Sequence, residues 1–369
     1  MLNVLALTYY FPRISETFVL DQLLFVKNSC NLTIYSLCNP NKQRALEDLE
    51  IERRRHQETK ELLARTFYEI DTTKFVMLKT ILLDHFDILH FQFGEMYAQV
   101  EKLVKGRKSI LTLHTRSNLN RLVTNSKLKD QANLVLLPTS RYLTEKCWSL
   151  LPGLDRKLTL THYLGVDTKK YCPSESRKML ANSAFSVVLN GRFVSKKGHL
   201  TALRAFRIVV NEVPNARLVF IGDGLMRGEI ENEIVKLDLT GNVFLTGKLE
   251  RDEVINIYKM ADVGIQPSEG YAGSEEGLPT AIMEYSAMQL AVVATRHAGI
   301  PEVVKHNKTG FLIRERDTHD LARRLISLAR SKRLNQDLGV RGRNFMVSAL
   351  ELEKQNQELL DIYGQLVKI

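Results

Sequence analysis

Two glutamates eight residues apart, Glu276 and Glu284, lie in the stretch of the chain that is richest in chemically useful residues. Gly277 lets the backbone come close to a ligand, and Pro279 suits the first turn of a helix. A helix that starts there, after a strand expected over 263–266, offers free N–H groups to an anion. One carboxylate could accept hydrogen bonds from sugar hydroxyls and the other from a ribose diol. A surface helix with acidic residues in its first turn is the alternative, and spacing alone does not separate the two.

A second loop carries two cations close together. Arg192 and Lys197 lie between a strand that ends at Asn190 and a helix expected to start near His199. A diphosphate leaving group needs such neutralisation, because negative charge develops on it as its bond breaks. The alternative is a solvated basic loop, which is common in a chain this basic.

His114 directly follows the apolar run 109–113. A histidine there could reach the floor of a cleft and hydrogen-bond a sugar hydroxyl or the reacting centre. A lone histidine is more often a structural hydrogen bonder, and the same holds for His90 and His162. The chain has no His-Glu-x-x-His and no Asp-x-Asp motif. We therefore expect neither a metal nor another cofactor.

The composition is that of an ordinary globular protein, with 44% apolar and 25% charged residues, and 369 residues suggest two domains or one large barrel. The formal charge of +10 implies an anionic partner: nucleic acid, an acidic membrane face or a phosphorylated ligand. The four cysteines show no Cys-x-x-Cys spacing, so neither a zinc site nor a redox pair is indicated. The apolar start reads as a strand rather than a signal peptide, and no transmembrane helix is expected.

Short apolar runs alternate with amphipathic stretches, which predicts β-α-β units and parallel sheets. The predicted strands are 3–8, 31–38, 87–91, 109–113, 133–138, 185–190, 217–221, 242–245, 263–266, 291–294 and 310–313. The predicted helices are 17–27, 43–82, 199–211, 225–237, 251–260, 280–288, 317–331 and 351–369.

The expected fold is therefore α/β, with two Rossmann-like, doubly wound domains facing across a cleft that is the natural site. The first domain is expected over 1–168, a linker over 169–183, and the second domain over 184–350. Residues 351–369 form the last helix.

Residues 185–330 resemble the C-terminal domain of the retaining GT-B glycosyltransferases, specifically glycosyltransferase family 4. The resemblance lies in the order of several motifs. These are Gly-Arg-Phe-Val-Ser-Lys-Lys-Gly at 191–198, Leu-Val-Phe-Ile-Gly-Asp-Gly at 218–224, Val-Phe-Leu-Thr-Gly at 243–247, Tyr-Lys-Met-Ala-Asp at 258–262, Glu276 with Glu284, Gly-Ile-Pro-Glu-Val-Val at 299–304 and Thr-Gly-Phe-Leu at 309–312. Residues 11–19 are similar to the opening of bacterial exopolysaccharide members of the colanic-acid type.

This resemblance implies roles for the candidate residues. Residues 1–168 would be the acceptor-binding domain and 184–350 the nucleotide-sugar-binding domain, with 351–369 packing back on the first. Arg192 and Lys197 would hold the diphosphate, Glu284 the ribose and Glu276 the sugar. The backbone N–H groups of Gly277, Leu278 and Thr280 would lie near the phosphates, and His114 near the reaction centre. The candidates for an acceptor or phosphate loop are Ser15, Glu16 and Thr17, where many relatives have Gly-Gly. Pro279 departs from the family by removing one N–H.

The resemblance further implies a retaining hexosyltransferase of bacterial cell-surface polysaccharide synthesis. A UDP-sugar is the favoured donor, and a saccharide or lipid-linked saccharide is the acceptor. Residues 101–150 hold ten Lys and Arg against three Asp and Glu, which suggests contact with an anionic membrane. We expect a cytoplasmic protein, peripheral on the inner face of the membrane, that binds no nucleic acid. A sugar-nucleotide epimerase of the same fold and a basic nucleic-acid-binding protein are the alternatives.

Overall fold

The computed structural model describes residues 1–9, 17–38, 67–71, 85–125, 133–173, 184–271, 275 and 277–368. The chain forms two compact units. Unit 1 consists of Met1–Gly165 together with Leu352–Ile369, and unit 2 is Val166–Glu351. Of the expected linker, residues 174–183 lie outside the described residues.

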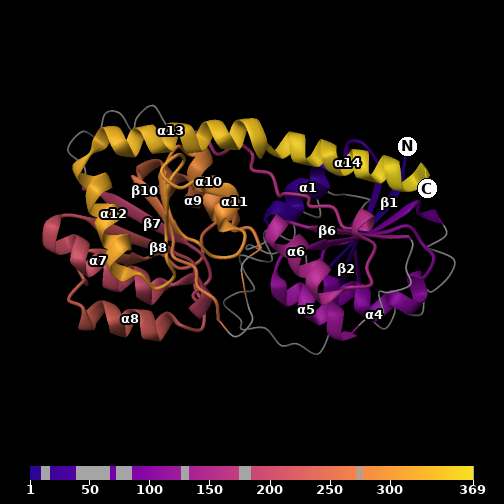
Figure 1. Ribbon diagram of the computed structural model, residues 1–369, viewed down its shortest axis with the longest axis horizontal. Coiled ribbons are helices and arrows are strands. Elements are labelled where there is room, and N and C mark those ends of the chain that lie inside the picture. Colours follow the sequence, from indigo (N-terminus) through magenta and orange to yellow (C-terminus); the bar gives the residue numbers. More distant parts are fainter. Residues whose placement is uncertain are drawn as a thin grey trace. The chain divides into compact units, whose positions relative to one another are not determined.

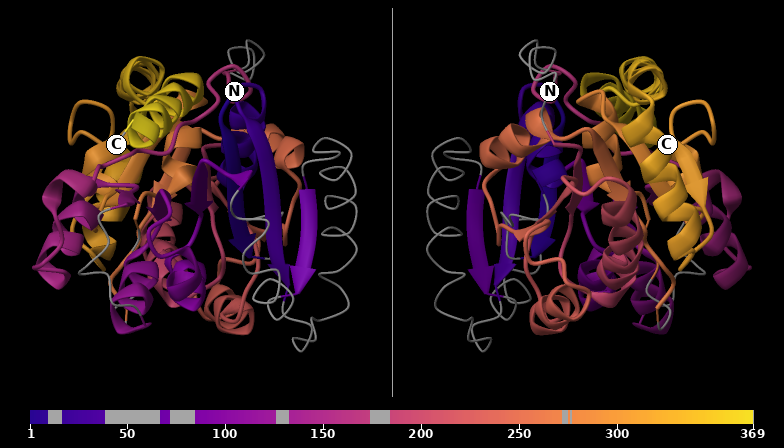
Figure 2. Two further views of the ribbon diagram at one scale, coloured as in Figure 1. Left: turned by 90° about the vertical axis from the view of Figure 1, so that its right-hand side faces the viewer. Right: turned by 90° about the vertical axis from the view of Figure 1, so that its left-hand side faces the viewer.

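Unit 1 contains one parallel sheet with the strand order β3-β2-β1-β4-β5-β6. Its strands are β1 (Asn3–Tyr9), β2 (Asn31–Cys38), β3 (Phe67–Asp71), β4 (Ile88–Phe91), β5 (Ser109–Leu113) and β6 (Leu134–Pro138). Its helices are α1 (Thr17–Lys27), α4 (Gly94–Val104), α5 (Arg116–Asn125), α6 (Arg141–Leu150) and α14 (Leu352–Lys368), with a short 3-10 turn at Arg156–Leu158. Figure 2 shows the N-terminal strands side by side.

The sheet of unit 1 is buried on both faces, which explains why its strands read as continuous apolar runs. Side chains alternate along a strand, so Val4 and Ala6 join one core while Leu5 and Leu7 join the other. All four are at most 1% exposed.

Helix α14 covers one of these faces, next to α1 (Figure 1). Leu359, Tyr363 and Leu366 belong to the same buried cluster as Val4 and Ala6. Lys108 Nζ also donates to the carbonyl of Val367 near the end of the helix, at 2.6 Å. The last helix therefore packs on the N-terminal domain, as the resemblance implied.

Strand β3 corrects the expectation of a helix-like segment over 43–82. Residues Phe67–Asp71 pair in parallel with β2, in a register that joins Ile34 to Phe67 and Cys38 to Asp71. The segment Phe-Tyr-Glu-Ile-Asp is rich in strand-forming residues, but its charge-rich flanks obscured that signal. The rest of 43–82 lies outside the described residues.

Unit 2 repeats the architecture, with the parallel order β12-β11-β10-β7-β8-β9. Its strands are β7 (Ser186–Asn190), β8 (Arg217–Ile221), β9 (Val243–Leu245), β10 (Val263–Gln266), β11 (Ala291–Thr295) and β12 (Phe311–Ile313). Its helices are α7 (His199–Glu212), α8 (Arg227–Lys236), α9 (Arg251–Met260), α10 (Thr280–Ala287), α11 (Ile300–Val303), α12 (Thr318–Arg330) and α13 (Lys332–Ala349), with a 3-10 turn at Ser195–Lys197.

In both sheets the strand order reverses beside the first strand of the unit. In unit 2 that point lies between β7 and β10, and ligands of such sheets bind outside the carboxyl ends of the strands there. The expected fold class, two Rossmann-like domains, is confirmed. No helix in the described part of the chain is both long and apolar enough to cross a membrane.

Acid should destabilise unit 1 through its buried histidines. Burial lowers the pKa of His90 and of His114 from 6.5 to about 3. Between these pKa values the two imidazoles bind protons in the unfolded chain but not in the folded unit. The neutral histidines therefore do not lower the free energy of unfolding above about pH 6.5. Below that pH the free energy of unfolding falls progressively, until the pH reaches about 3. Urea unfolding, followed by the fluorescence of Trp148, the single tryptophan, should shift to lower urea concentration between about pH 7.5 and about pH 5.

The variant His90→Asn tests the cause. It loses the bonds to Tyr363 Oη at 2.6 Å and Thr112 Oγ1 at 2.7 Å, so its stability at neutral pH falls. Its pH slope should also flatten by up to about 1.4 kcal/mol per pH unit. The exposed His319→Asn in unit 2 is the control. A wild-type midpoint that does not change with pH would contradict the explanation.

Candidate active site

The loop after β7 and the loop after β10 touch at the point where the strand order reverses. Gly198 adopts a φ of +71°, and a Cβ there would lie 1.9 Å from the carbonyl oxygen of Pro267. The N–H of Glu269 donates to the carbonyl of Lys196 at 3.0 Å. Only glycine permits this approach, so the backbone fixes both loops at the ligand-binding edge of the sheet.

The two predicted cations lie on the first of these loops. Arg192 is exposed, and Lys197 is partly buried. The stem of Lys197 crosses Gly191, where an added Cβ would meet its Cδ at 3.3 Å. Burial and then the charge of Lys197 lower the pKa of the neighbouring His199 to about 3, so this histidine adds no charge to the loop. Arg192 and Lys197 each carry a positive charge that an anion at this loop would meet.

Two tyrosines hold the carboxylate of Glu284, the fifth residue of α10. Tyr258 Oη donates to Oε2 at 2.9 Å, and Tyr171 Oη donates to Oε1 at 3.2 Å. Asn190, at the end of β7, donates through Nδ2 to Tyr258 Oη at 2.7 Å. Burial and then the charge of Glu284 raise the pKa of Tyr258 well above its usual value, which keeps this phenol a neutral donor.

A third tyrosine ties α10 to the strand that carries the cations. Tyr285 Oη accepts from the backbone N–H of Asn190 at 2.6 Å. Its ring lies against Gly264 of β10, where a Cβ would be 2.3 Å from ring carbons. Glu284 and the Arg192 loop are therefore connected through Asn190.

Tyr171 belongs to the segment that begins unit 2. Arg343 of α13 donates to the carbonyls of Tyr171 at 3.0 Å and Thr168 at 3.1 Å, and also to that of Ala287 at the end of α10. One partly buried guanidinium thus fixes the segment that carries Tyr171 against the helix that carries Glu284.

The start of α10 carries several of the residues that were expected to face an anion. Gly277 and Leu278 are buried and Thr280 is partly buried. Pro279 is the N-cap rather than the first helical residue, and no side chain in the described part of the chain caps this helix. Ile282 and Met283 pack inward as expected, at 0% and 1% exposure. Glu276 lies outside the described residues.

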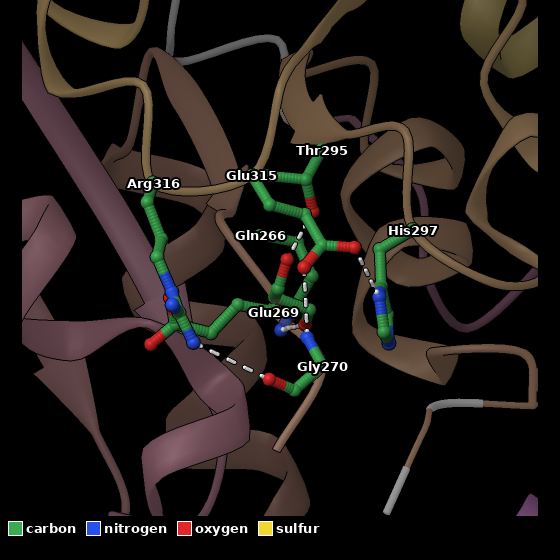
Figure 3. Close-up of polar contacts among 8 residues, drawn as sticks. Gln266, Glu269, Gly270, Thr295, His297, Glu315 and Arg316 are labelled. Atoms are coloured by element: carbon green, nitrogen blue, oxygen red, sulfur yellow. Dashed lines mark hydrogen bonds and ion pairs between the residues drawn. The ribbon is translucent and has the colours of Figure 1, made fainter. Parts of the chain in front are cut away.

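The loop after β10 is held by polar contacts with two neighbouring strand ends (Figure 3). Glu315 accepts from the N–H of Gly270 at 2.9 Å and bonds His297 Nδ1 at 2.8 Å. Arg316 Nε donates to Glu269 at 2.6 Å. Burial raises the pKa of Glu315, but the bonds from Gly270 and His297 outweigh it, so the pKa falls below its usual value. Glu315 is therefore a charged anchor for this loop.

His114 of unit 1 is 8% exposed, between the rings of Phe18 at 4.9 Å and Phe93 at 5.3 Å. Both ring nitrogens are buried, and a hydrogen bond with the backbone of Gln92 partly offsets the lowering of the pKa by burial. With a pKa of about 3, its imidazole is neutral near pH 7, so it can donate a hydrogen bond but does not supply a proton as imidazolium. His90 and His162 are bonded within the fold.

Other predicted positions can be placed only in part. Ser15 and Glu16 lie outside the described residues, and Thr17 is the first residue of α1. The described residues include no group of three or more His, Cys, Asp or Glu able to hold a metal ion.

Sequence reasoning assigned no role to Tyr171, Tyr258, Tyr285, Asn190 or Arg343. Tyr258 was noted as the first residue of Tyr-Lys-Met-Ala-Asp, and Asn190 as the end of a strand. A tyrosine that faces a carboxylate 113 residues away leaves no local pattern.

Removing one phenol should weaken unit 2. Tyr258→Phe takes the donor from Glu284 Oε2 and the acceptor from Asn190 Nδ2, both of them partly buried. We expect a loss of about 1–3 kcal/mol in the free energy of unfolding of unit 2, measured by far-UV circular dichroism in urea. The urea midpoint followed by Trp148 fluorescence, which reports on unit 1, should stay the same. The matched control is Tyr271→Phe, at a side chain 57% exposed. Equal stability of the two variants would show that the buried bonds contribute nothing.

Comparison with known proteins gives a family and several relatives. Residues 176–345 match the family described as Glycosyl transferases group 1. The amylovoran biosynthesis glycosyltransferase AmsK of Erwinia amylovora is 29% identical over 257 residues, which are 67% of this chain and 62% of AmsK. The putative colanic acid biosynthesis glycosyltransferase WcaL of Escherichia coli is 30% identical over 178 residues, 48% of this chain and 43% of WcaL. The chain thus spans less than two thirds of the length of either relative.

Solved structures agree on the fold. The Anabaena protein Alr3699/HepE, solved in complex with UDP and glucose, superposes with a TM-score of 0.79 at 15% identity, covering 99% of this chain and 100% of that one. A glycosyltransferase from Rickettsia africae gives a TM-score of 0.73 at 16% identity, covering 100% of this chain and 99% of the other. Residues 176–345 thus match the family Glycosyl transferases group 1, the relatives are named as glycosyltransferases of exopolysaccharide synthesis, and the solved structures share the fold of the whole chain.

Proposed function

We propose that this protein is a retaining glycosyltransferase of family 4. It moves a hexose from a nucleotide-diphosphate sugar to a saccharide or lipid-linked saccharide in the synthesis of a bacterial cell-surface polysaccharide. The observation that carries the proposal is the Arg192 and Lys197 loop. It lies where the strand order of unit 2 reverses and is connected through Asn190 to the carboxylate of Glu284.

Each residue has a defined task in this proposal. Arg192 and Lys197 neutralise the diphosphate, on which negative charge grows as the bond to the sugar breaks. Glu284 accepts hydrogen bonds from the ribose. Glu276 contacts the sugar, and the N–H groups of Gly277, Leu278 and Thr280 face the phosphates.

In unit 1, the neutral imidazole of His114 donates a hydrogen bond at the reacting centre. Ser15, Glu16 and Thr17 line the acceptor or phosphate loop. We propose no metal, because the two cations already supply the charge that a divalent ion would bring.

A UDP-sugar is the donor we favour. The Anabaena protein of like fold has been solved with UDP and with UDP-glucose, and AmsK and WcaL are named for the biosynthesis of amylovoran and colanic acid. These names motivate the assignment to a cell-surface glycan, and a cytoplasmic location is part of the same proposal.

The loop cations should control donor binding. Thermal unfolding is measured with UDP, GDP, ADP and dTDP and their sugars, in EDTA. A ligand at about 100 times its dissociation constant adds about 2.7 kcal/mol of apparent stability. We expect the wild type to respond to UDP and UDP-sugars, and Arg192→Gln and Lys197→Gln to lose both this response and the transfer activity. Lys236→Gln, at a lysine side chain 76% exposed on α8, is the control.

Two outcomes would contradict this proposal. If both loop variants keep wild-type turnover with a confirmed donor, the diphosphate site is wrong. If the wild type responds to no nucleotide, the enzyme assignment loses its support. An epimerised sugar nucleotide formed without acceptor would instead favour the epimerase, since that reaction needs no second substrate.

A basic face of unit 1 should bind anionic membrane. Lys102 and Lys105 around the end of α4, and Arg121 on α5, are exposed, whereas Lys127 and Lys129 lie outside the described residues. Each Lys or Arg near an acidic bilayer adds about 1 kcal/mol. We expect flotation with phosphatidylglycerol vesicles, weakened by salt and by the triple change Lys102→Gln, Lys105→Gln and Arg121→Gln. If the wild type stays in the unbound fraction at low salt, unit 1 does not bind anionic membrane and this proposal is wrong.

A further inference from the structure

A hollow lined mainly by basic side chains lies at the edge strand of unit 2, outside the candidate donor site. It is an open, shallow depression of about 550 Å³ between the ends of β11 and β12 and the first turns of α12. Its basic lining residues are Arg296, His306, Arg314, His319, Arg323 and Arg324. Arg192, Lys197 and Glu284 do not line it. We call it the basic hollow.

The two acidic residues of the hollow are already engaged. Asp317 is the N-cap of α12 and accepts the N–H of Asp320 at 2.9 Å. Asp320 pairs with Arg323 and, at 3.3 Å, with Arg324. Four arginines face two aspartates in the lining, so an excess of two positive charges remains.

That excess lies with Arg296 and Arg314, which the sheet places side by side. Thr295 of β11 is in register with Ile313 of β12, so the residues that follow them lie on adjacent parallel strand ends. Such neighbours are about 4.8 Å apart in the backbone. No carboxylate of the described residues forms a salt bridge with either guanidinium. An anion between them would remove the repulsion of two like charges.

The other members of the hollow suit an oxyanion. The guanidinium of Arg324 stacks on the ring of Phe311 at 4.5 Å, an arrangement that leaves the edge of the group to bind oxygen atoms. His306 Nδ1 accepts the N–H of Leu312 at 2.9 Å, so the proton of its neutral ring is on Nε2 as a donor. Burial, then the charges of Arg296 and Arg324, lower the pKa of His306, and the charge of Asp320 partly opposes them.

We propose that the basic hollow is a second anion site, which binds a phosphate group carried by a small phosphorylated metabolite or by a lipid headgroup. Planar guanidinium groups fit phosphate oxygens two at a time, and paired arginines are typical of such sites. The site is separate from the donor diphosphate, so a molecule bound here leaves the donor loops free.

The direct test is a titration of the full chain with inorganic phosphate near pH 7, followed by the ring signals of His306 in NMR and by calorimetry. A bound phosphate should raise the pKa of His306, since it offsets the charges of Arg296 and Arg324. Arg296→Gln and Arg314→Gln should each weaken binding about tenfold or more.

Arg333→Gln, at a side chain 94% exposed on α13, is the matched control and should bind as the wild type does. Unchanged affinity in the two hollow variants, or a His306 signal that ignores phosphate, would overturn the proposal.

Vesicles distinguish the two sources of phosphate. Phosphatidylcholine vesicles with and without phosphatidic acid are floated with the wild type, Arg296→Gln/Arg314→Gln and Arg333→Gln. Only the difference between the double variant and Arg333→Gln counts, because unit 1 has its own basic face. If the double variant alone loses flotation, the ligand is a headgroup. If flotation is equal while phosphate binding is lost, the ligand is a free phosphate ester. Equal behaviour in both assays refutes the site.

Discussion

The close packing of the loop after β7 on the loop after β10 is the contact on which the candidate donor site depends. Gly198 can adopt its left-handed conformation beside Pro267 only because it has no side chain. That approach lets Glu269 bond to Lys196 and sets the Arg192 and Lys197 loop beside the segment that leads to α10. Glu315 and Arg316 bond to Gly270 and Glu269 of the loop after β10. These bonds hold that loop in place, and with it the loop after β7.

The fold could be predicted because its signal is local. Strands buried on both faces appear as short apolar runs, and ten or more residues of helical pattern between them imply parallel pairing. Strand β3 shows the limit of such reasoning. Its five residues include two charged side chains, so the stretch lacked the apolar run that marked the other strands. The segment becomes a strand because the edge of β2 offers backbone groups for pairing. That edge belongs to the sheet and leaves no signal in the sequence of the segment.

The site was predictable to the extent that its residues follow strands. Arg192 and Lys197 come directly after β7, and the sequence alone placed them at the sheet edge. Tyr171 and Arg343 could not be found in this way, because each acts across more than 100 residues on a partner that only the fold brings near. Asn190 was taken as the end of a strand, yet it joins two tyrosines through its backbone and its side chain. Its role depends on the arrangement of α9 and α10 and has no sequence signature.

Two phenols donate hydrogen bonds to the partly buried carboxylate of Glu284. A partly buried carboxylate loses hydration, and hydrogen bonds to its charged form offset that loss. Tyr258 and Tyr171 provide such bonds as neutral phenols, so they stabilise the charge without cancelling it as an arginine would. A carboxylate has about four lone-pair positions, and the two tyrosines occupy one on each oxygen. Each oxygen of the carboxylate is thus held by a donor that carries no charge. The carboxylate that we assign to the ribose is thus oriented before the nucleotide arrives, and binding need not pay to order it.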